Sequence, residues 1–221
     1  MNNYFYYDCH SHHLNTNPKV MSIYVAPLNF LELSLNPFLP FCLGLHPWDR
    51  DKVNFEEWCT KHQKHFLDKN CWAIGEVGLD RIKNPDPKIP EEYLLYFFNQ
   101  ALNLKKPLVL HIVKAHDELQ GFLNKHTEFQ TMPLIIHAYQ ASIEITTKLK
   151  AYNVYFSLGA RELKRPAKAS YTDLLFDRML LESDDGSITI QECYELAAKF
   201  FNKSLSEIEN KVKENFTKLF F

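Results

Sequence analysis

The feature that most constrains the fold is an alternation of short β-rich runs with helical patterns along the whole chain. Alternating strands and helices are typical of parallel sheets with crossover connections. Eight candidate strands in 221 residues predict an α/β fold, a closed (β/α)8 TIM-type barrel near its lower size limit of about 200 residues. A doubly wound open sheet is the alternative. The candidate strands are Tyr4–Cys9, Ser22–Ala26, Phe41–Leu45, Trp72–Glu76, Leu108–His111, Leu134–His137, Val154–Ser157 and Met179–Glu182.

The connections between these runs differ along the chain. In the C-terminal part, Thr189-x-x-Glu192 and Ser204-x-x-Glu207 are capping boxes that predict the starts of two helices. The links 9–22 and 26–41 carry Asn and Pro without a convincing helical pattern. We therefore expect a compact barrel whose wall is eroded around the first two βα units.

The composition predicts one globular domain spanning residues 1–221. Hydrophobic residues make up 46% and charged residues 24%, and six glycines without a Gly/Ser tract leave no linker. No segment is apolar enough to cross a bilayer, and the N-terminus lacks the basic region of a secretory signal. The five cysteines form no Cys-x-x-Cys pair, which suits a reducing compartment. We expect a cytoplasmic monomer without a membrane partner.

Two histidines follow the first candidate strand at a spacing that suits chelation. His10 and His12 are two residues apart, so they point to the same side of an extended chain, whereas His13 points away. In a barrel that side is the interior. Two inward imidazoles at the end of a strand can hold one metal ion.

Other candidate ligands also lie where strands are expected to end: Glu76, His111, His137 and Asp184. In a (β/α)8 barrel these ends share one face. Six nitrogen and oxygen ligands are too many for a closed tetrahedral site and suit two divalent ions, with Glu76 bridging them. Because no thiolate takes part, zinc, manganese and magnesium all remain open.

A set of ordered motifs extends over nearly the whole chain. The motifs are Asp8-x-His10-x-His12, Gly44-Leu45-His46-Pro47, Gly75-Glu76-Val77-Gly78-Leu79-Asp80, Lys106–His111, Ile136-His137, Glu182-Ser183-Asp184 and Glu214–Phe220. In this order and spacing they resemble the TatD-related metal-dependent hydrolases, the TatD-type DNase family. The resemblance implies a TIM-type barrel with a binuclear metal centre and, as in many members, phosphodiester cleavage in DNA. It also implies that His10 and His12 would hold one metal with Asp184, Glu76 would bridge, and His111 and His137 would hold the second.

Three departures from the family pattern concern the substrate loops, so the chain resembles a short member with trimmed loops. Residues 112–115 replace the usual Ser-Arg-Asp-Ala, and residues 138–141 replace Cys-Phe-Ser-Gly. After Asp184 the chain runs almost directly into a helix instead of a long loop. The sequence therefore predicts the chemistry more firmly than the specificity.

The predicted reaction is hydrolysis by a metal-activated hydroxide, with Asp184 and Glu76 as catalytic residues. Two divalent ions carry more positive charge than these two carboxylates neutralise, which favours an anionic phosphate ester as substrate. Because the net charge is −2, we expect DNA ends or short single strands instead of long duplex. The candidate substrate-binding residues are His46, Lys114 and Arg161, and Trp48 and Tyr139 in mouth loops are candidates for stacking on a base or sugar.

Two other functions fit the same barrel. One is an amidohydrolase acting on a C–N or C–O bond of a small molecule. Many such enzymes bridge their metals with a modified lysine where this chain has Glu76, which favours the phosphoesterase. The other is a catalytically weak barrel used for binding, which the trimmed loops leave open.

Overall fold

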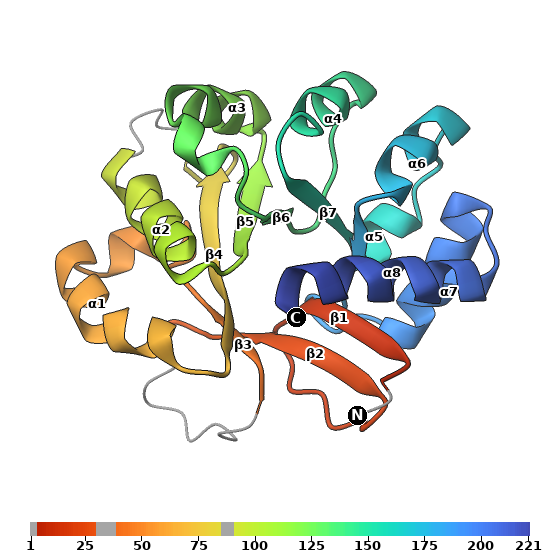
Figure 1. Cartoon of the computed structure of the whole chain (residues 1–221), viewed down its shortest axis with the longest axis horizontal. Helices are drawn as coiled ribbons and strands as arrows, with labels where there is room; N and C mark the ends of the chain where they lie inside the picture. Colours follow the sequence, from red (N-terminus) through yellow and green to blue (C-terminus); the bar gives the residue numbers. More distant parts are fainter. Residues whose placement is uncertain (1–3, 30–38, 85–90) are drawn as a thin grey trace.

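The fold is a parallel sheet of eight strands in sequence order, with helices packed around part of it (Figure 1). A computed structural model describes residues 4–29, 39–84 and 91–221. All seven pairs of consecutive strands are parallel. The strands are β1 (Tyr6–Ser11), β2 (Val20–Val25), β3 (Phe41–Leu43), β4 (Cys71–Asp80), β5 (Leu108–Val113), β6 (Leu134–Ile136), β7 (Val154–Leu158) and β8 (Met179–Leu181).

The first and last strands meet, so the sheet forms a nearly closed barrel. The backbone N–H of His12 donates to the carbonyl of Asp184 over 2.9 Å, and the N–H of Asp184 donates to the carbonyl of His10 over 3.0 Å. Ser11 and Asp184 form a parallel bridge. The predicted TIM-type barrel is confirmed, and the open sheet is excluded because its end strands would not pair.

The two C-terminal helices begin at the capping side chains that the sequence predicts. Thr189 and Ser204 form the predicted capping boxes with Glu192 and Glu207. Among the described residues, no helix is both long and apolar enough to cross a membrane. The helices are α1 (Phe55–His62), α2 (Glu91–Leu104), α3 (His116–Lys125), α4 (Ile143–Leu149), α5 (Ala160–Leu163), α6 (Ala169–Phe176), α7 (Ile190–Phe201) and α8 (Leu205–Phe220), with 3-10 turns η2 (Arg50–Lys52), η3 (Gln63–Leu67) and η4 (Thr127–Phe129).

Helix α8 covers the outside of the barrel near the junction of β1 and β8. Its Phe216 packs against Tyr7 of β1, with ring centroids 4.9 Å apart. The buried amide of Asn215 donates to the carbonyl of Met179 at the start of β8 over 2.8 Å. The C-terminal helix therefore supports the two strands that close the barrel.

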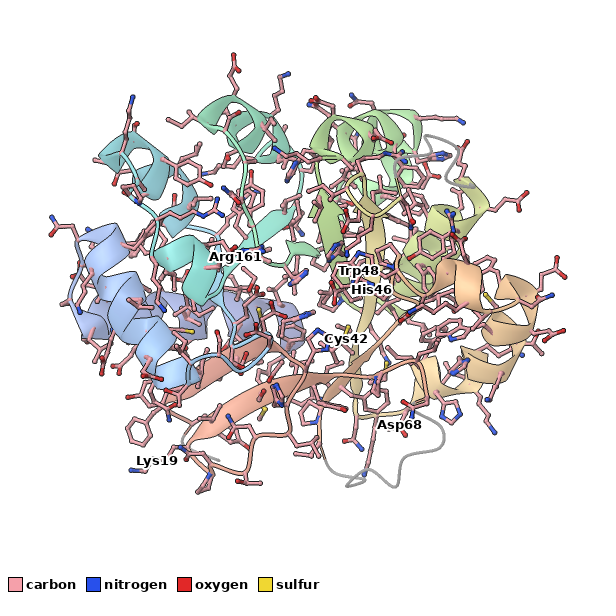
Figure 2. All side chains as sticks on the ribbon, turned by 180° about the vertical axis from the view of Figure 1, so that it is seen from behind. Lys19, Cys42, His46, Trp48, Asp68 and Arg161 are labelled. Carbon is pink, nitrogen blue, oxygen red and sulfur yellow. The ribbon has the colours of Figure 1, made fainter. Side chains whose placement is uncertain are left out.

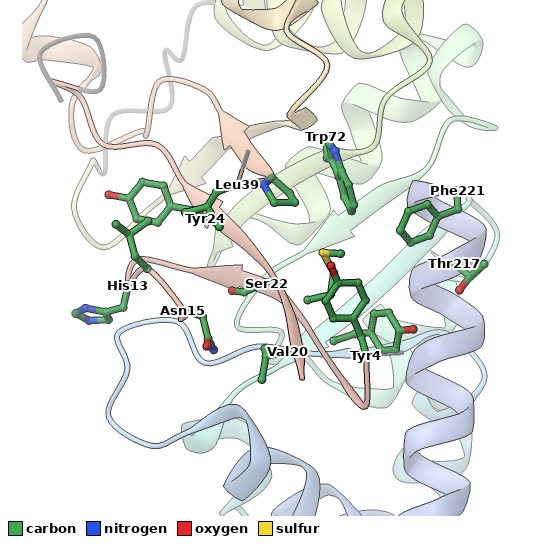
Figure 3. A pocket seen from close by; sticks show the side chains of 14 residues that line it. Tyr4, His13, Asn15, Val20, Ser22, Tyr24, Leu39, Trp72, Thr217 and Phe221 are labelled. Carbon is green, nitrogen blue, oxygen red and sulfur yellow. The ribbon is translucent and has the colours of Figure 1, made fainter. Parts of the chain in front are cut away.

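Among the described residues, no helix covers the wall outside β2 in this way, as the sequence predicts. No helix occurs in 12–19, between β1 and β2, or in the described parts of the next link, 26–29 and 39–40. A groove of about 670 Å³ lies on this side, which we call the β2 groove (Figure 3). Side chains lining it include those of Tyr4, Leu14, Tyr24, Trp72 and Phe221.

Strand β4 is longer than predicted. The sequence places its end at Glu76, but the strand continues to Asp80 because Gly78 and Asp80 still pair with His111 and Val113 of β5. Glu76 therefore lies within the strand and not at its end, so this prediction was wrong. Its side chain is still part of the barrel interior, with only 3% of the residue exposed.

Candidate metal centre

Glu76 lies at the centre of the cluster formed by the predicted ligands. Gly75 precedes it with a φ of +128°, and a Cβ at this position would lie 2.4 Å from the carbonyl oxygen of Val109 in β5. Only glycine combines that backbone angle with so close an approach. The Gly-Glu pair therefore lets β4 pack tightly on β5 while its carboxylate enters the barrel.

The first oxygen of Glu76 faces three imidazoles. Oε1 lies 2.8 Å from Nδ1 of His111, 2.8 Å from Nε2 of His137 and 3.3 Å from Nε2 of His46. His111 belongs to β5, and His137 directly follows β6. The approach of His46 was not predicted, because the sequence placed this residue among the substrate contacts.

The second oxygen of Glu76 faces the other side of the cluster. Oε2 lies 3.3 Å from Nε2 of His10 and 3.8 Å from Nε2 of His12. Oδ1 of Asp184 lies 3.8 Å and 3.6 Å from the same two nitrogens. Asp184 has a left-handed backbone with φ of +48°, a costly conformation for a non-glycine residue. The two backbone hydrogen bonds at the barrel junction hold it there.

The structure thus brings all six predicted ligands together, and their role as ligands stays a prediction. Burial alone would raise the pKa of Glu76, but the adjacent His137 and His10 outweigh it and hold this pKa well below its usual value. Burial lowers the pKa of His137, yet Glu76 and Glu182 raise it well above the ordinary range. Burial and the neighbouring His10 lower the pKa of His12 to about 4.

Three further carboxylates border the cluster, and sequence analysis gave them no role. Oε1 of Glu182 lies 3.5 Å from Nδ1 of His137 and accepts from the N–H of Ala138 over 2.8 Å. Asp8 accepts from the hydroxyl and the N–H of Ser183, over 2.7 Å and 3.1 Å. Burial raises the pKa of Asp8 to about 6. The third carboxylate, Asp80, contacts His111.

Their spacing could have revealed them. Asp8 precedes His10 by two residues, Glu182 precedes Asp184 by two, and Asp80 follows Glu76 by four. Residues separated by an even number along a strand share one side. Asp8 and Asp80 therefore follow the same rule that predicted the pairing of His10 with His12, whereas Glu182 and Asp184 lie just after the end of β8.

The chemistry of this cluster fits divalent cations. Within the described part of the chain, both ring nitrogens of His10 are buried without a hydrogen-bond partner, as are Nδ1 of His137 and Oε2 of Glu182. Such atoms are costly to bury unless something binds them. In the same part of the chain, four sets of three side chains offer ligand atoms within 4.8 Å of one another. Histidine nitrogens and carboxylate oxygens are suitable ligands for zinc and manganese.

A cavity of about 630 Å³ opens beside the cluster, on the face where the strands end. His46 and Arg161, both predicted to contact substrate, line it together with Trp48. Figure 2 shows Trp48 and His46 close together and Arg161 apart from them. Lys114 is exposed just after β5 and does not belong to the lining, so its substrate contact remains only a sequence prediction.

The prediction for Tyr139 was wrong. Its ring is 1% exposed and packs against Phe156, with centroids 4.4 Å apart. Its hydroxyl lies 2.8 Å from Oγ1 of Thr146. Sequence position after β6 suggested an open loop, but α4 returns over it and closes the space. Tyr139 therefore has no open face for a base or sugar.

Fold and site together define a (β/α)8-barrel protein with a candidate metal centre of histidines and carboxylates. The family described as TatD related DNase matches residues 28–221, and the chain belongs to this family. The predicted family is thereby confirmed.

Similar proteins agree with this assignment. Two are named uncharacterized metal-dependent hydrolases: one from Buchnera aphidicola subsp. Baizongia pistaciae is 25% identical over 71% of this chain, and one from Haemophilus influenzae is 25% identical over 69%. The matches cover 59% and 61% of these relatives, so the chain spans about three fifths of their length. A TatD homologue from Escherichia coli shares the fold, with a TM-score of 0.77 at 17% identity over 100% of this chain and 99% of the other. A TatD family hydrolase from Entamoeba histolytica has a TM-score of 0.73 at 14% identity with the same coverage.

Proposed function

We propose that this protein is a metal-dependent hydrolase that cleaves phosphodiester bonds at a binuclear centre. The observation that carries the proposal is the position of Glu76, whose two oxygens face two separate groups of side chains. A carboxylate in this position can bridge two cations. The name of the family supports action on DNA, and the names of the two bacterial relatives support a metal-dependent hydrolase.

Each group can hold one divalent ion. The first ion would be bound by His10, His12, Asp184 and Oε2 of Glu76. The second would be bound by His111, His137 and Oε1 of Glu76, with His46 close enough to join. The donor set accepts zinc, manganese or magnesium.

Ions bound at this centre would activate a water molecule and stabilise charge on the phosphate oxygens. The chain's own residues would arrange the reactants around them. Asp184 lies beside His10 and His12 and also lines the cavity, so its carboxylate can orient the attacking water and accept its proton. Arg161 lines another part of the cavity and can donate hydrogen bonds to the phosphate. Nδ1 of His46 accepts from the backbone N–H of Trp48, so His46 has only Nε2 with which to donate to the phosphate or to join the second ion.

The size of the cavity favours a short substrate. A volume of about 630 Å³ falls in the range of roughly 300–1,000 Å³ that is typical of small-molecule sites. With a net charge of −2, the protein has no overall field to attract long duplex DNA. We therefore propose DNA ends, short single strands or small phosphodiesters as substrates.

The test combines metal content with hydrolysis of bis(4-nitrophenyl) phosphate in manganese or magnesium. We expect two ions per chain and turnover in the wild type, and loss of turnover by about a hundredfold or more in Asp184→Asn. Asp173→Asn, on the exposed face of α6, is the matched control and should behave as wild type. Bound metal without phosphodiester cleavage would contradict the proposed substrate and point to the amidohydrolase or binding functions. Absence of bound metal would contradict the centre itself.

A further inference from the structure

Trp48 occupies an unusual position beside the candidate metal centre. It follows β3 by a short loop, lines the cavity and is 48% exposed (Figure 2). Its indole N–H donates to Oδ2 of Asp80 over 2.7 Å. The ring therefore has a fixed polar end and an exposed aromatic surface.

Asp80 connects this ring to the metal cluster. It is 3% exposed, and the same Oδ2 that accepts from Trp48 lies 3.2 Å from Nε2 of His111. Its other oxygen, Oδ1, accepts from the N–H groups of Ile82 and Lys83, over 2.9 Å and 3.0 Å. The position of Trp48 relative to a proposed metal ligand is thus set by one buried carboxylate.

The surroundings of Trp48 suit a planar anionic ligand. The ring makes edge contacts with His46 and His111, at centroid distances of 4.8 Å and 5.6 Å. Nζ of Lys83 lies 5.3 Å from the ring centroid, which places a positive charge over the aromatic surface. Ile82, also in the lining, is 66% exposed. The cavity therefore joins an apolar and aromatic wall to the side that would bind phosphate.

A single exposed apolar side chain is common on protein surfaces and needs no function. Trp48 differs because its donor is bound inside the cavity and its ring lies next to two histidines of the cluster. The other tryptophans provide a contrast: Trp58 is 5% exposed, and Trp72 lies in the β2 groove. Aromatic rings in nucleic-acid sites stack on nucleobases. Removal of such a ring lowers the affinity for the nucleic acid by roughly five- to a hundredfold.

We propose that Trp48 determines specificity by stacking on the planar group, a nucleobase, that is joined to the phosphate in the cavity. Asp80 is a positioning residue that fixes the distance between this stacking surface and His111. The inference rests on the proposed function for the phosphate side of the cavity, and it adds the recognition of the group attached to that phosphate.

The test compares binding of thymidine 5′-monophosphate with that of ribose 5-phosphate, which lacks the planar base. Affinities are measured by calorimetry in magnesium with wild type, Trp48→Leu and Trp48→Phe. We expect wild type to prefer the nucleotide by about tenfold, Trp48→Leu to lose that preference without weaker binding of ribose 5-phosphate, and Trp48→Phe to keep most of it. Equal binding of both ligands by wild type, or equal weakening of both in Trp48→Leu, would overturn the inference.

A second measurement addresses Asp80. In a Trp58→Phe, Trp72→Phe background, the fluorescence of Trp48 alone reports its environment. Asp80→Ala should shift its emission to longer wavelength and abolish the nucleotide preference, whereas Asp80→Asn should restore part of it because an amide oxygen still accepts from the indole. Identical behaviour of the alanine and asparagine variants would contradict the positioning role.

The outcome for the inference is separate from that for the proposed function. If wild type prefers the nucleotide but does not cleave bis(4-nitrophenyl) phosphate, the proposal of phosphodiester cleavage fails and the stacking site stands. If cleavage occurs without nucleotide preference, the stacking site fails alone.

Discussion

Strands β5 and β2 belong to the same sheet but differ in the cover of their outer faces. All six residues of β5 are apolar except His111, and five of the six are buried, because α2 and α3 pack on this strand. In β2 the burial alternates, and Ser22 and Tyr24 remain partly exposed. A strand buried on both faces reads as a continuous apolar run, whereas a strand with one open face alternates.

The difference shows where this barrel needs its helices. β4 and β5 carry Glu76 and His111, and both are enclosed in the core. β2 carries none of the proposed ligands, and its outer face borders the β2 groove. A barrel wall can therefore lose its helical cover where the strand's outward residues tolerate water and the site does not depend on it.

The largest expected effect is on metal binding and hydrolysis, and it concerns the helix-covered side of the barrel around β4 and β5. Glu76→Gln keeps the shape of the side chain and removes its charge, so we expect less than two bound ions and a loss of phosphodiester hydrolysis of about a hundredfold or more. Metal analysis and turnover of bis(4-nitrophenyl) phosphate measure both. Tyr24→Phe, in the β2 groove, should leave both unchanged. If Glu76→Gln kept full metal content and activity, the helix-covered side around β4 and β5 would matter no more for the site than the open side at β2.

A matched pair of leucines tests the same contrast in stability. Leu180 of β8 is fully buried, so Leu180→Ala should lower the free energy of unfolding by about 2–5 kcal/mol. Leu14 is 49% exposed in the β2 groove, so Leu14→Ala should cost about 0.5 kcal/mol or less. Urea unfolding measures both. Similar costs would mean that the β2 groove is covered in solution.

Asn215 tests whether α8 supports the closing strands. Asn215→Ala leaves the carbonyl of Met179 without its donor, which should cost about 1–3 kcal/mol of unfolding free energy. Asn210→Ala, exposed on the same helix, should cost about 0.5 kcal/mol or less. If the two variants unfold at the same urea concentration, the hydrogen bond to β8 contributes nothing.

The smallest effect is expected at the start of the same helix. Ser204 accepts from the N–H of Glu207, and Ser204→Ala should lower the free energy of unfolding by about 1 kcal/mol. Ser206→Ala, exposed in the first turn, is the control. In thermal unfolding, Ser204→Ala should have a lower transition temperature than Ser206→Ala. The opposite order would refute the cap.

Much of the fold follows from local pattern. The eight strands, the capping boxes and the eroded wall all depend on residue types that neighbour one another in sequence, so they could be predicted. The six candidate ligands could also be placed on one face because the ends of parallel strands meet there. What failed depended on pairing: β4 extends past Glu76 because β5 continues beside it, and Tyr139 is buried because α4 returns over its loop.

The role of Asp80 was out of reach for another reason, although Trp48 was already a candidate for stacking. Asp80 was visible in a motif, but its hydrogen bond with Trp48 joins the end of β4 to the loop after β3, and the sequence alone does not bring these two segments together. Only the structure shows that one carboxylate contacts both the indole and His111. Contacts between loops depend on the exact length of the strands that carry them.

The junction of β1 with β8 also has a consequence for synthesis of the protein. The hydrogen bond between Ser11 and Ser183 joins residues 172 positions apart, and His10 and Asp184 meet at the same place. Ribosomes add about 5–20 residues per second, so the first histidines wait on the order of ten seconds or more for their carboxylate partner. During that interval the nascent chain offers His10 and His12 without Asp184. The proposed set of metal ligands is therefore complete only after translation of the last strand.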